Sequence, residues 1–140
     1  MSLKIYCKDK ECLPYKKHYT DAGLDLRSAE IVVLHPSVVT KVKTGIHVEI
    51  PEDYVGLIFP RSGLSTKHGI RLANTVGVID SDYRGEILCA LKTDSLITIE
   101  AYERIAQLVV VPVMINYEYV NTLEDLSITE RGSGGFGSTG

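Results

Sequence analysis

The sequence is poor in cysteine and has no tryptophan: Cys7, Cys12 and Cys89 are the only three cysteines among its 140 residues. An odd number without a Cys-x-x-Cys pair does not make a disulfide framework and fits a reducing compartment. Cys7, Cys12 and His18 would give a zinc ion only three ligands at loose spacing, so a zinc site is not favoured. We interpret the cysteines as plain thiols, with Cys89 as a small core residue.

The sequence also lacks a long apolar run and a large excess of charge of one sign. No stretch has the apolar length that crosses a bilayer. The N-terminal stretch MSLKIYCKDKECLPYKK has scattered charge and no apolar core of the kind found in secretory signals. We expect a protein without a membrane segment that acts inside a cell, in the cytoplasm or the nucleus, and both a cellular and a viral source fit. The formal net charge of −3 provides no basic field for long nucleic acid, which favours a small partner.

Alternating apolar and β-branched residues predict an all-β chain. Turn signals such as Pro36-Ser37 and Thr44-Gly45 separate the apolar runs at the spacing of a sandwich or jelly roll. The one helical piece is short, from Leu64 to His68. We therefore predict a single jelly-roll-like β-sandwich or barrel over residues 1–130. The main strands are expected at residues 3–6, 31–34, 38–42, 46–50, 55–59, 86–91, 96–99, 105–113 and 115–120.

The last ten residues, RGSGGFGSTG at 131–140, include five glycines. Such a segment loses too much conformational entropy to fold alone, so we predict a mobile C-terminal arm. Its cation, hydroxyls and ring, on Arg131, Ser138, Thr139 and Phe136, suit a phosphate and a flat ring. A flexible terminus without a role is the alternative. No lysine follows the glycines, so the segment is not a P-loop.

The stretch NTVGVIDSDYRGEI at residues 74–87 concentrates most of the candidate chemistry. The β-branched residues around Gly77 predict a short hairpin whose tip exposes backbone groups. Asp80 and Asp82 would lie on one face if the strand persists, with Tyr83 on the other. A carboxylate beside an aromatic ring and exposed backbone can activate water next to a flat, polar ligand. A β-turn with solvated acids is the alternative.

Two earlier segments place charged residues beside small ones. In DAGLDLRS, at 21–28, the Asp25 carboxylate can face a hydrated magnesium ion, although a turn with a solvated acid fits equally well. In PRSGLS, at 60–65, the Arg61 guanidinium, the Ser62 hydroxyl and the N–H groups of a helix start form a possible anion cradle. The alternative is that Ser62 only caps the helix.

Polar residues also interrupt an apolar run in RIAQL, at residues 104–108. Arg104 and Gln107 need partners if the strand is buried, because an unpaired buried polar group is costly. The partner can belong to the protein or to a ligand.

Together, five motifs in this order resemble the trimeric deoxyuridine triphosphatase (dUTPase) family. They are DAGLDLRS, PRSGLS, GVIDSDYRGEI, RIAQLV and RGSGGFGSTG, and the resemblance spans residues 21–140. It implies Mg²⁺-assisted hydrolysis of dUTP to dUMP and pyrophosphate by a homotrimer of jelly-roll-like subunits that share their active sites. Such a dUTP diphosphatase keeps uracil out of DNA and supplies dUMP for dTTP synthesis.

The resemblance also implies a role for each motif. Asp80 would deprotonate the attacking water at the α-phosphate, and Asp25 would hold Mg²⁺ through water. The 131–140 arm would close from a neighbouring subunit. The implied substrate-binding residues are Asn74, Gly77, Val78, Ile79 and Tyr83 for the nucleoside, Arg61, Ser62, Gly63 and Gln107 for the phosphates, and Arg131, Phe136, Gly137, Ser138 and Thr139 in the arm.

Two other functions remain open from the sequence. A dCTP deaminase shares the fold, but Asp80 and Tyr83 in their GVIDSDYRGEI context argue against it. A non-catalytic relative that binds dUTP as a switch is the other alternative. The chain departs from the common pattern at Glu103, where the family often has aspartate, and this longer acid affects a local contact and leaves Gln107 in place.

Overall fold

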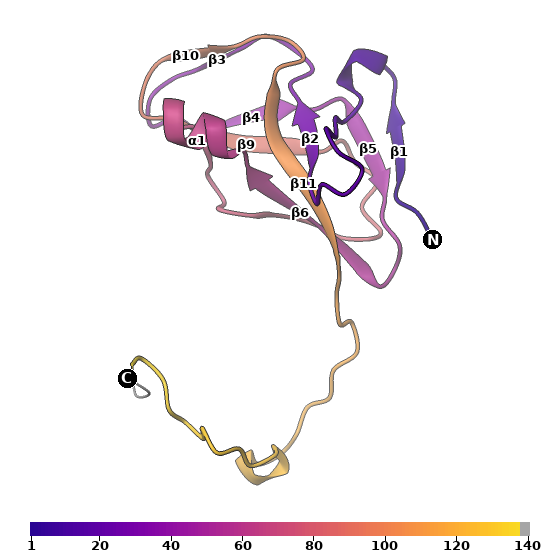
Figure 1. Ribbon diagram of the computed structural model, residues 1–140, viewed down its shortest axis with the longest axis vertical. Coiled ribbons are helices and arrows are strands. Elements are labelled where there is room, and N and C mark those ends of the chain that lie inside the picture. Colours follow the sequence, from indigo (N-terminus) through magenta and orange to yellow (C-terminus); the bar gives the residue numbers. More distant parts are fainter. Residues whose placement is uncertain (138–140) are drawn as a thin grey trace.

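The computed structural model describes residues 1–137 and consists of a β-rich body from which the C-terminal segment extends (Figure 1). Ser138 and Thr139, two of the implied substrate ligands, lie outside the described residues. Within residues 1–137, no helix is long and apolar enough to cross a membrane. In chain order the elements are β1 (Lys4–Cys7), η1 (Lys10–Cys12), β2 (Leu24–Arg27), β3 (Val32–Leu34), β4 (Thr40–Lys43), β5 (Ile46–Glu49), β6 (Tyr54–Pro60), α1 (Ser62–His68), β7 (Arg71–Leu72), β8 (Gly77–Ile79), β9 (Leu88–Lys92), β10 (Ile97–Ile99), β11 (Arg104–Pro112) and η2 (Leu123–Asp125).

Antiparallel sheets pack around one core and confirm the predicted all-β, jelly-roll-like class. The largest sheet has the order β2-β11-β6-β8, and a three-stranded sheet has the order β4-β9-β7. Two-stranded pairs of β1 with β5 and of β3 with β10 complete the body. The two-residue alternation of the sequence sets which side chains face inward: in β4, for example, Val42 is buried between the exposed Lys41 and Lys43.

The core is aliphatic and includes all three cysteines. Cys7, Cys12 and Cys89 are free thiols, each at most 2% exposed, as the sequence predicts for plain thiols. The largest fully buried apolar side chains are Leu26, Leu34, Val42, Ile46, Ile58, Ile87, Leu91, Ile99, Ile105 and Leu108.

The structure corrects several of the local predictions. The short strands β2 and β7 were not expected. The helix begins at Ser62, two residues before its predicted start. The 74–87 stretch is not a hairpin, because β7 pairs with β9 and β8 pairs with β6, so the turn between them joins two different sheets.

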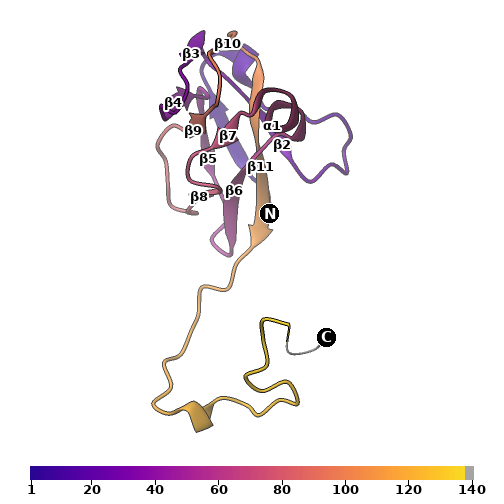
Figure 2. The ribbon, with the colours of Figure 1, turned by 90° about the vertical axis from the view of Figure 1, so that its left-hand side faces the viewer.

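The predicted strand at residues 115–120 is wrong for the single chain. After Pro112 the chain leaves the body, and both views show the segment running away from the sheets before it bends back (Figures 1 and 2). Residues 113–120 are exposed, and the alternating side chains of Ile115, Tyr117 and Tyr119 contact solvent. A strand needs a partner for its backbone groups, and the body offers none along this path.

Candidate active site

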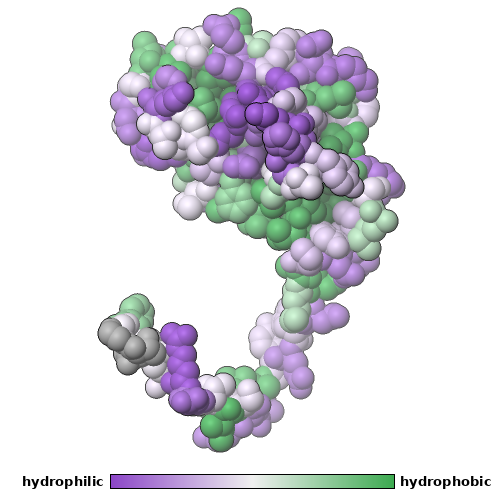
Figure 3. All heavy atoms as spheres, in the orientation of Figure 1, coloured by the Kyte–Doolittle hydropathy of each residue, from purple (hydrophilic) through white to green (hydrophobic). Residues whose placement is uncertain are grey.

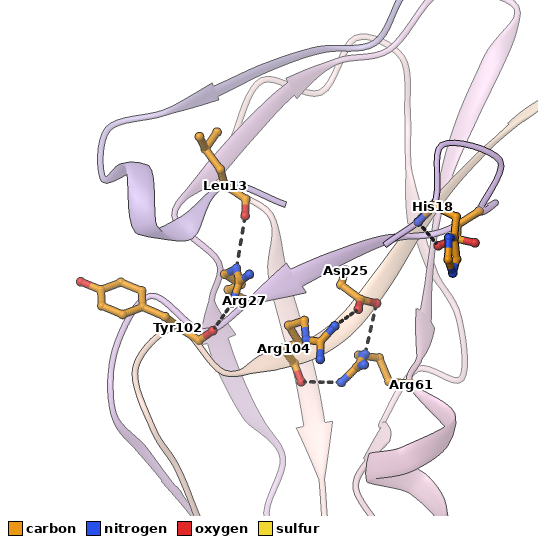
Figure 4. A network of polar contacts seen from close by, with 8 residues as sticks. Leu13, His18, Asp25, Arg27, Arg61, Tyr102 and Arg104 are labelled. Atoms are coloured by element: carbon orange, nitrogen blue, oxygen red, sulfur yellow. Dashed lines mark hydrogen bonds and ion pairs between the residues drawn. The ribbon is translucent and has the colours of Figure 1, made fainter. Parts of the chain in front are cut away.

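A cleft of about 370 Å³ opens beside the strands β2, β6 and β11. Its centre is the Asp25 carboxylate, which the three strands place between two guanidinium groups (Figure 4). The lining residues are Tyr15, Lys16, Lys17, Asp21, Ala22, Gly23, Asp25, Arg61, Arg104 and Gln107. The structure thus brings three of the predicted motifs together, those containing Asp25, Arg61 and Gln107.

Both oxygens of Asp25 accept hydrogen bonds from arginine. Arg61 Nε donates to Oδ1 at 3.1 Å, and Arg104 Nη1 donates to Oδ2 at 3.1 Å. The side chain of Asp25 is 19% exposed, so this pairing is partly shielded from water. Arg104 also lies over the ring of Tyr15, with its guanidinium carbon 4.9 Å from the ring centroid. The cluster is a preorganised arginine pair that now holds a carboxylate and has the geometry to hold a phosphate.

Gln107 is fixed between β6 and a glycine of the first motif. Its Nε2 donates to the carbonyl oxygen of Pro60 at 3.1 Å. A Cβ on Gly23 would collide with Gln107 Oε1 and would lie 3.3 Å from Gln107 Cβ. The glycine therefore makes room for the amide at the floor of the cleft.

Helix α1 begins at the edge of the cleft, directly after Arg61. Arg61 is the N-cap residue, and among residues 1–137 no side chain caps this end. Ser62 and Gly63 are exposed and lie in the first turn, so their backbone N–H groups face solvent. Ser62 is thus a first-turn residue and not the cap, which leaves the predicted anion cradle accessible.

A second group of predicted residues surrounds β8. Asn74 lies in the exposed turn between β7 and β8, where Thr75 N–H donates to Leu72 O at 3.2 Å. Val78 projects outward and is 63% exposed, while Gly77 and Ile79 are half-buried. Strand β8 is an edge strand of the four-stranded sheet, so within residues 1–137 the backbone N–H and C=O groups on its outer side have no partner strand.

The loop after β8 is held in shape by bonds to itself and to β5. Asp80 is exposed, and its carbonyl oxygen accepts from Tyr83 N–H at 3.1 Å, so the strand ends here and does not continue to Asp82. Tyr83 Oη donates to Glu86 O at 3.0 Å. His47 Nδ1 and the Arg84 carbonyl oxygen lie 2.8 Å apart, and Gly45 N–H donates to Glu86 Oε1 at 2.9 Å.

Asp80 and Arg61 lie toward opposite ends of β6, and the residues of β8 lie between them. Because β8 runs antiparallel to β6, Gly77 faces Ile58 and Ile79 faces Gly56. Continuing this register places Asp80 beside Val55, about 20 Å along the strand from Arg61. Within one chain, Asp80 and Arg61 are farther apart than a triphosphate spans, so the predicted site residues form two separate half-sites.

The described arm residues, 131–137, join neither half-site in the single chain. Arg131 Nε donates to Gly134 O at 2.8 Å within the arm, and the Phe136 ring is fully exposed. Gly137, with φ of +85°, is the last residue that the structure describes. Figure 2 shows residues 131–137 well separated from the sheets.

Among residues 1–137, no cluster of three or more His, Cys, Asp or Glu side chains is placed to hold a metal ion. Asp25 is the predicted magnesium ligand, and both of its oxygens accept hydrogen bonds from arginine. This donor set fits magnesium that keeps most of its waters and arrives with phosphate ligands.

Sequence reasoning missed the residues that precede the first motif. Tyr15, Lys16 and Lys17 line the cleft, and Tyr15 pairs with Asp25 through backbone bonds of 2.9 and 2.8 Å. The pair of adjacent lysines is evident in the sequence, but nothing in the sequence showed that they lie in the same cleft as Asp25.

Comparison with known proteins shows which family this chain resembles. The dUTPase family profile matches residues 9–140. The deoxyuridine 5′-triphosphate nucleotidohydrolase of Corynebacterium jeikeium is 47% identical over 99% of this chain and 92% of its own. The dUTPase of Staphylococcus bacteriophage 80alpha, solved with dUPNHPP, has a TM-score of 0.86 at 36% identity, covering 99% and 98% of the two chains. The dUTPase of phage phi11 of Staphylococcus aureus, solved as a mutant with a structural Mg(II) ion, has a TM-score of 0.79 at 29% identity, covering 89% and 99%. With this coverage and identity, the chain belongs to the dUTPase family.

Proposed function

We propose that the protein is a dUTP diphosphatase that cleaves dUTP to dUMP and pyrophosphate, with Mg²⁺ bound to the substrate. The proposal rests on one observation: this member of the dUTPase family has both a cleft with two arginines and a hydrogen-bonded loop that carries Asp80 and Tyr83. By removing dUTP inside the cell, the reaction would keep uracil out of DNA and supply dUMP for dTTP synthesis.

The active site would form between subunits of a homotrimer. The separation of about 20 Å between Asp80 and Arg61 supports a shared site, because one chain cannot bring both to one triphosphate. The exposed apolar side chains of the segment after Pro112 support the same conclusion, since a neighbouring copy would bury them. Figure 3 shows this apolar surface where β11 ends and again around η2, where Leu123 is 79% exposed.

The nucleoside would bind along β8 and the loop that follows it. Backbone groups of Asn74, Gly77 and Ile79 at this free edge would pair with the uracil edge, and Val78 would contact the base. The Tyr83 ring, held by its bond to the Glu86 carbonyl oxygen, would pack on the deoxyribose and leave no room for a 2′-hydroxyl. This arrangement would select a deoxyuridine.

Asp80 would act as the general base. Its exposed carboxylate would take a proton from a water that attacks the α-phosphorus, while the bond to the bridging oxygen breaks and pyrophosphate leaves. Arg61, Gln107 and the N–H groups of Ser62 and Gly63 would bind the phosphates and stabilise the charge that moves onto the leaving group.

Asp25 would change partners when the substrate binds. Asp25 would hold a hydrated magnesium ion through a bound water, and the ion would supply positive charge against the phosphate oxygens. Arg61 and Arg104 would then lose their internal anion and become available to the phosphates. The two ion pairs of Asp25 seen in the structure thus keep the arginines oriented before the substrate arrives.

The arm, residues 131–140, would close over the substrate from a neighbouring subunit, and residues 1–130 would form the domain that precedes it. Phe136 would stack on uracil, and Arg131, Gly137, Ser138 and Thr139 would bind the terminal phosphate. Closure would exclude water from the reacting groups and commit the substrate to hydrolysis.

The test is pyrophosphate release from dUTP, dTTP, dCTP and UTP, measured side by side with magnesium and then with a chelator. Release confined to dUTP and weakened by the chelator is expected. Ammonia release from dCTP would indicate a deaminase, and binding of dUTP without any release would indicate a binding module. Equal release from all four nucleotides would contradict the proposed selectivity of β8 and Tyr83.

A further inference from the structure

The cleft beside Asp25 contains positive charge that the protein itself does not neutralise. Four of its lining side chains are cationic and two are acidic. Both acids are already engaged: Asp25 accepts from Arg61 and Arg104, and Asp21 Oδ2 accepts from the His18 backbone N–H at 2.8 Å. Within residues 1–137, Lys16 and Lys17 form no hydrogen bond or ion pair through their ammonium groups.

The two lysines are held at the cleft by the backbone beside them. Tyr15 forms both backbone bonds of an antiparallel bridge with Asp25, so the lysines follow directly from a residue fixed to β2. The Tyr15 ring lies against the guanidinium groups of Arg104 and Arg27, at 4.9 and 5.8 Å. At the far side of the loop, Asp21 N–H donates to His18 O at 3.1 Å and closes a turn. The loop is therefore anchored at both ends.

We propose that Lys16 and Lys17 bind the outer phosphates of the substrate and make the protein selective for a triphosphate chain over a monophosphate. The proposal rests on the proposed function, and it adds two residues from outside the five motifs to the phosphate site. A lysine ammonium on a flexible stem can follow phosphate oxygens without fixed geometry, which complements the rigid arginine pair. A single phosphate next to the sugar would lie at the half-site of Asp80 and would not reach them.

The predicted effect is electrostatic and falls on binding. Replacing both lysines with glutamine removes two charges that face a polyanion across a hydrated cleft. We expect the KM for dUTP to rise about tenfold at low ionic strength and the difference from the wild type to shrink at high salt. The affinity for dUMP should stay within about twofold of the wild-type value, because dUMP lacks the outer phosphates.

The experiment compares the wild type with K16Q/K17Q, with K16R/K17R and with the control K41Q. Lys41 is an exposed lysine on β4, in a different sheet from the cleft, and is not part of the proposed site. The measurements are the KM for dUTP and the inhibition constant of inorganic tripolyphosphate at two salt concentrations, and the dissociation constant of dUMP. K16R/K17R should restore the wild-type KM for dUTP and the wild-type inhibition constant of tripolyphosphate. K41Q should match the wild type in every measurement.

Two results would overturn the proposal. One is unchanged KM and unchanged tripolyphosphate inhibition in K16Q/K17Q. The other is an equal loss of dUMP affinity, which would mean that the substitutions disturb the site in general. If the wild type does not hydrolyse dUTP, the proposed function fails by itself, and calorimetric binding of tripolyphosphate to the same variants still tests the two lysines separately.

Discussion

At the scale of single residues, the missing side chain of Gly23 determines where Gln107 can lie. A Cβ at this position would occupy the place of the Gln107 amide oxygen. We expect Gly23→Ala to push the amide out of the cleft and to lower kcat/KM for dUTP about a hundredfold, because small displacements of a positioning group are costly. Steady-state kinetics of pyrophosphate release measures the effect, and a urea titration separates it from an overpacking loss of about 1–3 kcal/mol in stability.

The control for this prediction is the double variant with Gln107→Ala. If Gly23→Ala acts through Gln107, the double variant loses no more activity than Gln107→Ala alone, because the same interaction cannot be lost twice. Additive losses would show that the glycine acts on something else in the cleft.

The buried thiols give a second prediction at this scale. Burial raises the pKa of Cys89 to about 12, and burial also raises the pKa of Cys12, with the nearby Asp9 carboxylate adding to the effect. The thiolate is the reactive form, so at pH 8 only about one Cys89 thiol in ten thousand is ionised. We expect Ellman's reagent to modify none of the three cysteines in the native protein and all of them in guanidinium chloride. Rapid modification of the native protein would contradict the packing seen here.

At the scale of elements, helix α1 depends on the glycine that ends it. Gly69 has φ of +65° and ψ of 16°, and its N–H donates to Ser65 O at 3.2 Å. An alanine in this left-handed conformation is strained, and its Cβ would also approach Asp94 Oδ2 to 3.4 Å. We expect Gly69→Ala to lower the free energy of unfolding by about 1–2 kcal/mol, as measured by urea denaturation. The exposed helical residue Lys67, changed to alanine, should alter it by less than about 0.5 kcal/mol.

Strands with clear alternation could be predicted from the sequence, and the elements that depend on distant partners could not. In β4 and β5, inward-facing Val42, Ile46 and Val48 mark the buried face directly. The two-residue strand β7 is too short to show any period, and it exists because Leu72 pairs with Leu91 of β9. The 74–87 stretch looked like a hairpin because sequence spacing does not reveal that its two sides pair with different sheets.

The sequence singled out individual residues of the cleft, but it did not reveal how they are arranged. It indicated that Arg104 and Gln107 need partners, and the structure shows that Arg104 donates to Asp25 and Gln107 to the Pro60 carbonyl oxygen. Tyr15 lies beside β2 because it forms an isolated bridge with Asp25, ten residues later in the chain. A single bridge produces no periodic pattern in the sequence, so it could not be predicted. The division into two half-sites follows from the β6–β8 register, and register is a property of the folded sheet.

At the scale of the whole molecule, the arm should matter for turnover and not for assembly. Its residues 131–137 are largely exposed, and their hydrogen bonds stay within the arm or reach Thr129, two residues before it. We expect deletion of residues 131–140 to reduce kcat/KM for dUTP at least about a hundredfold, because the site then stays open to water. Light scattering should still give the mass of a trimer, since the apolar segment from Met114 to Ile128 remains. Unchanged turnover would exclude the role of a lid, and a monomer would place the arm in the assembly contacts.

The sharing of active sites between subunits can be tested by mixing two inactive variants. Asp80→Asn should bind dUTP without hydrolysing it, and Arg61→Ala should lose hydrolysis because a phosphate ligand is missing. In the single chain these residues lie about 20 Å apart along β6, so the proposed shared site takes Asp80 from one subunit and Arg61 from another.

Refolding the two variants together at equal amounts therefore restores complete sites. With random assembly, about a quarter of the sites combine an intact Asp80 with an intact Arg61, and turnover should recover to about that fraction of the wild-type value. Asp80→Asn mixed with a chain carrying both substitutions is the matched control, because no combination of those subunits contains Asp80. If the first mixture stays as inactive as this control, Asp80 and Arg61 serve the same site from one chain, and the separation along β6 would have to close by a movement within the subunit.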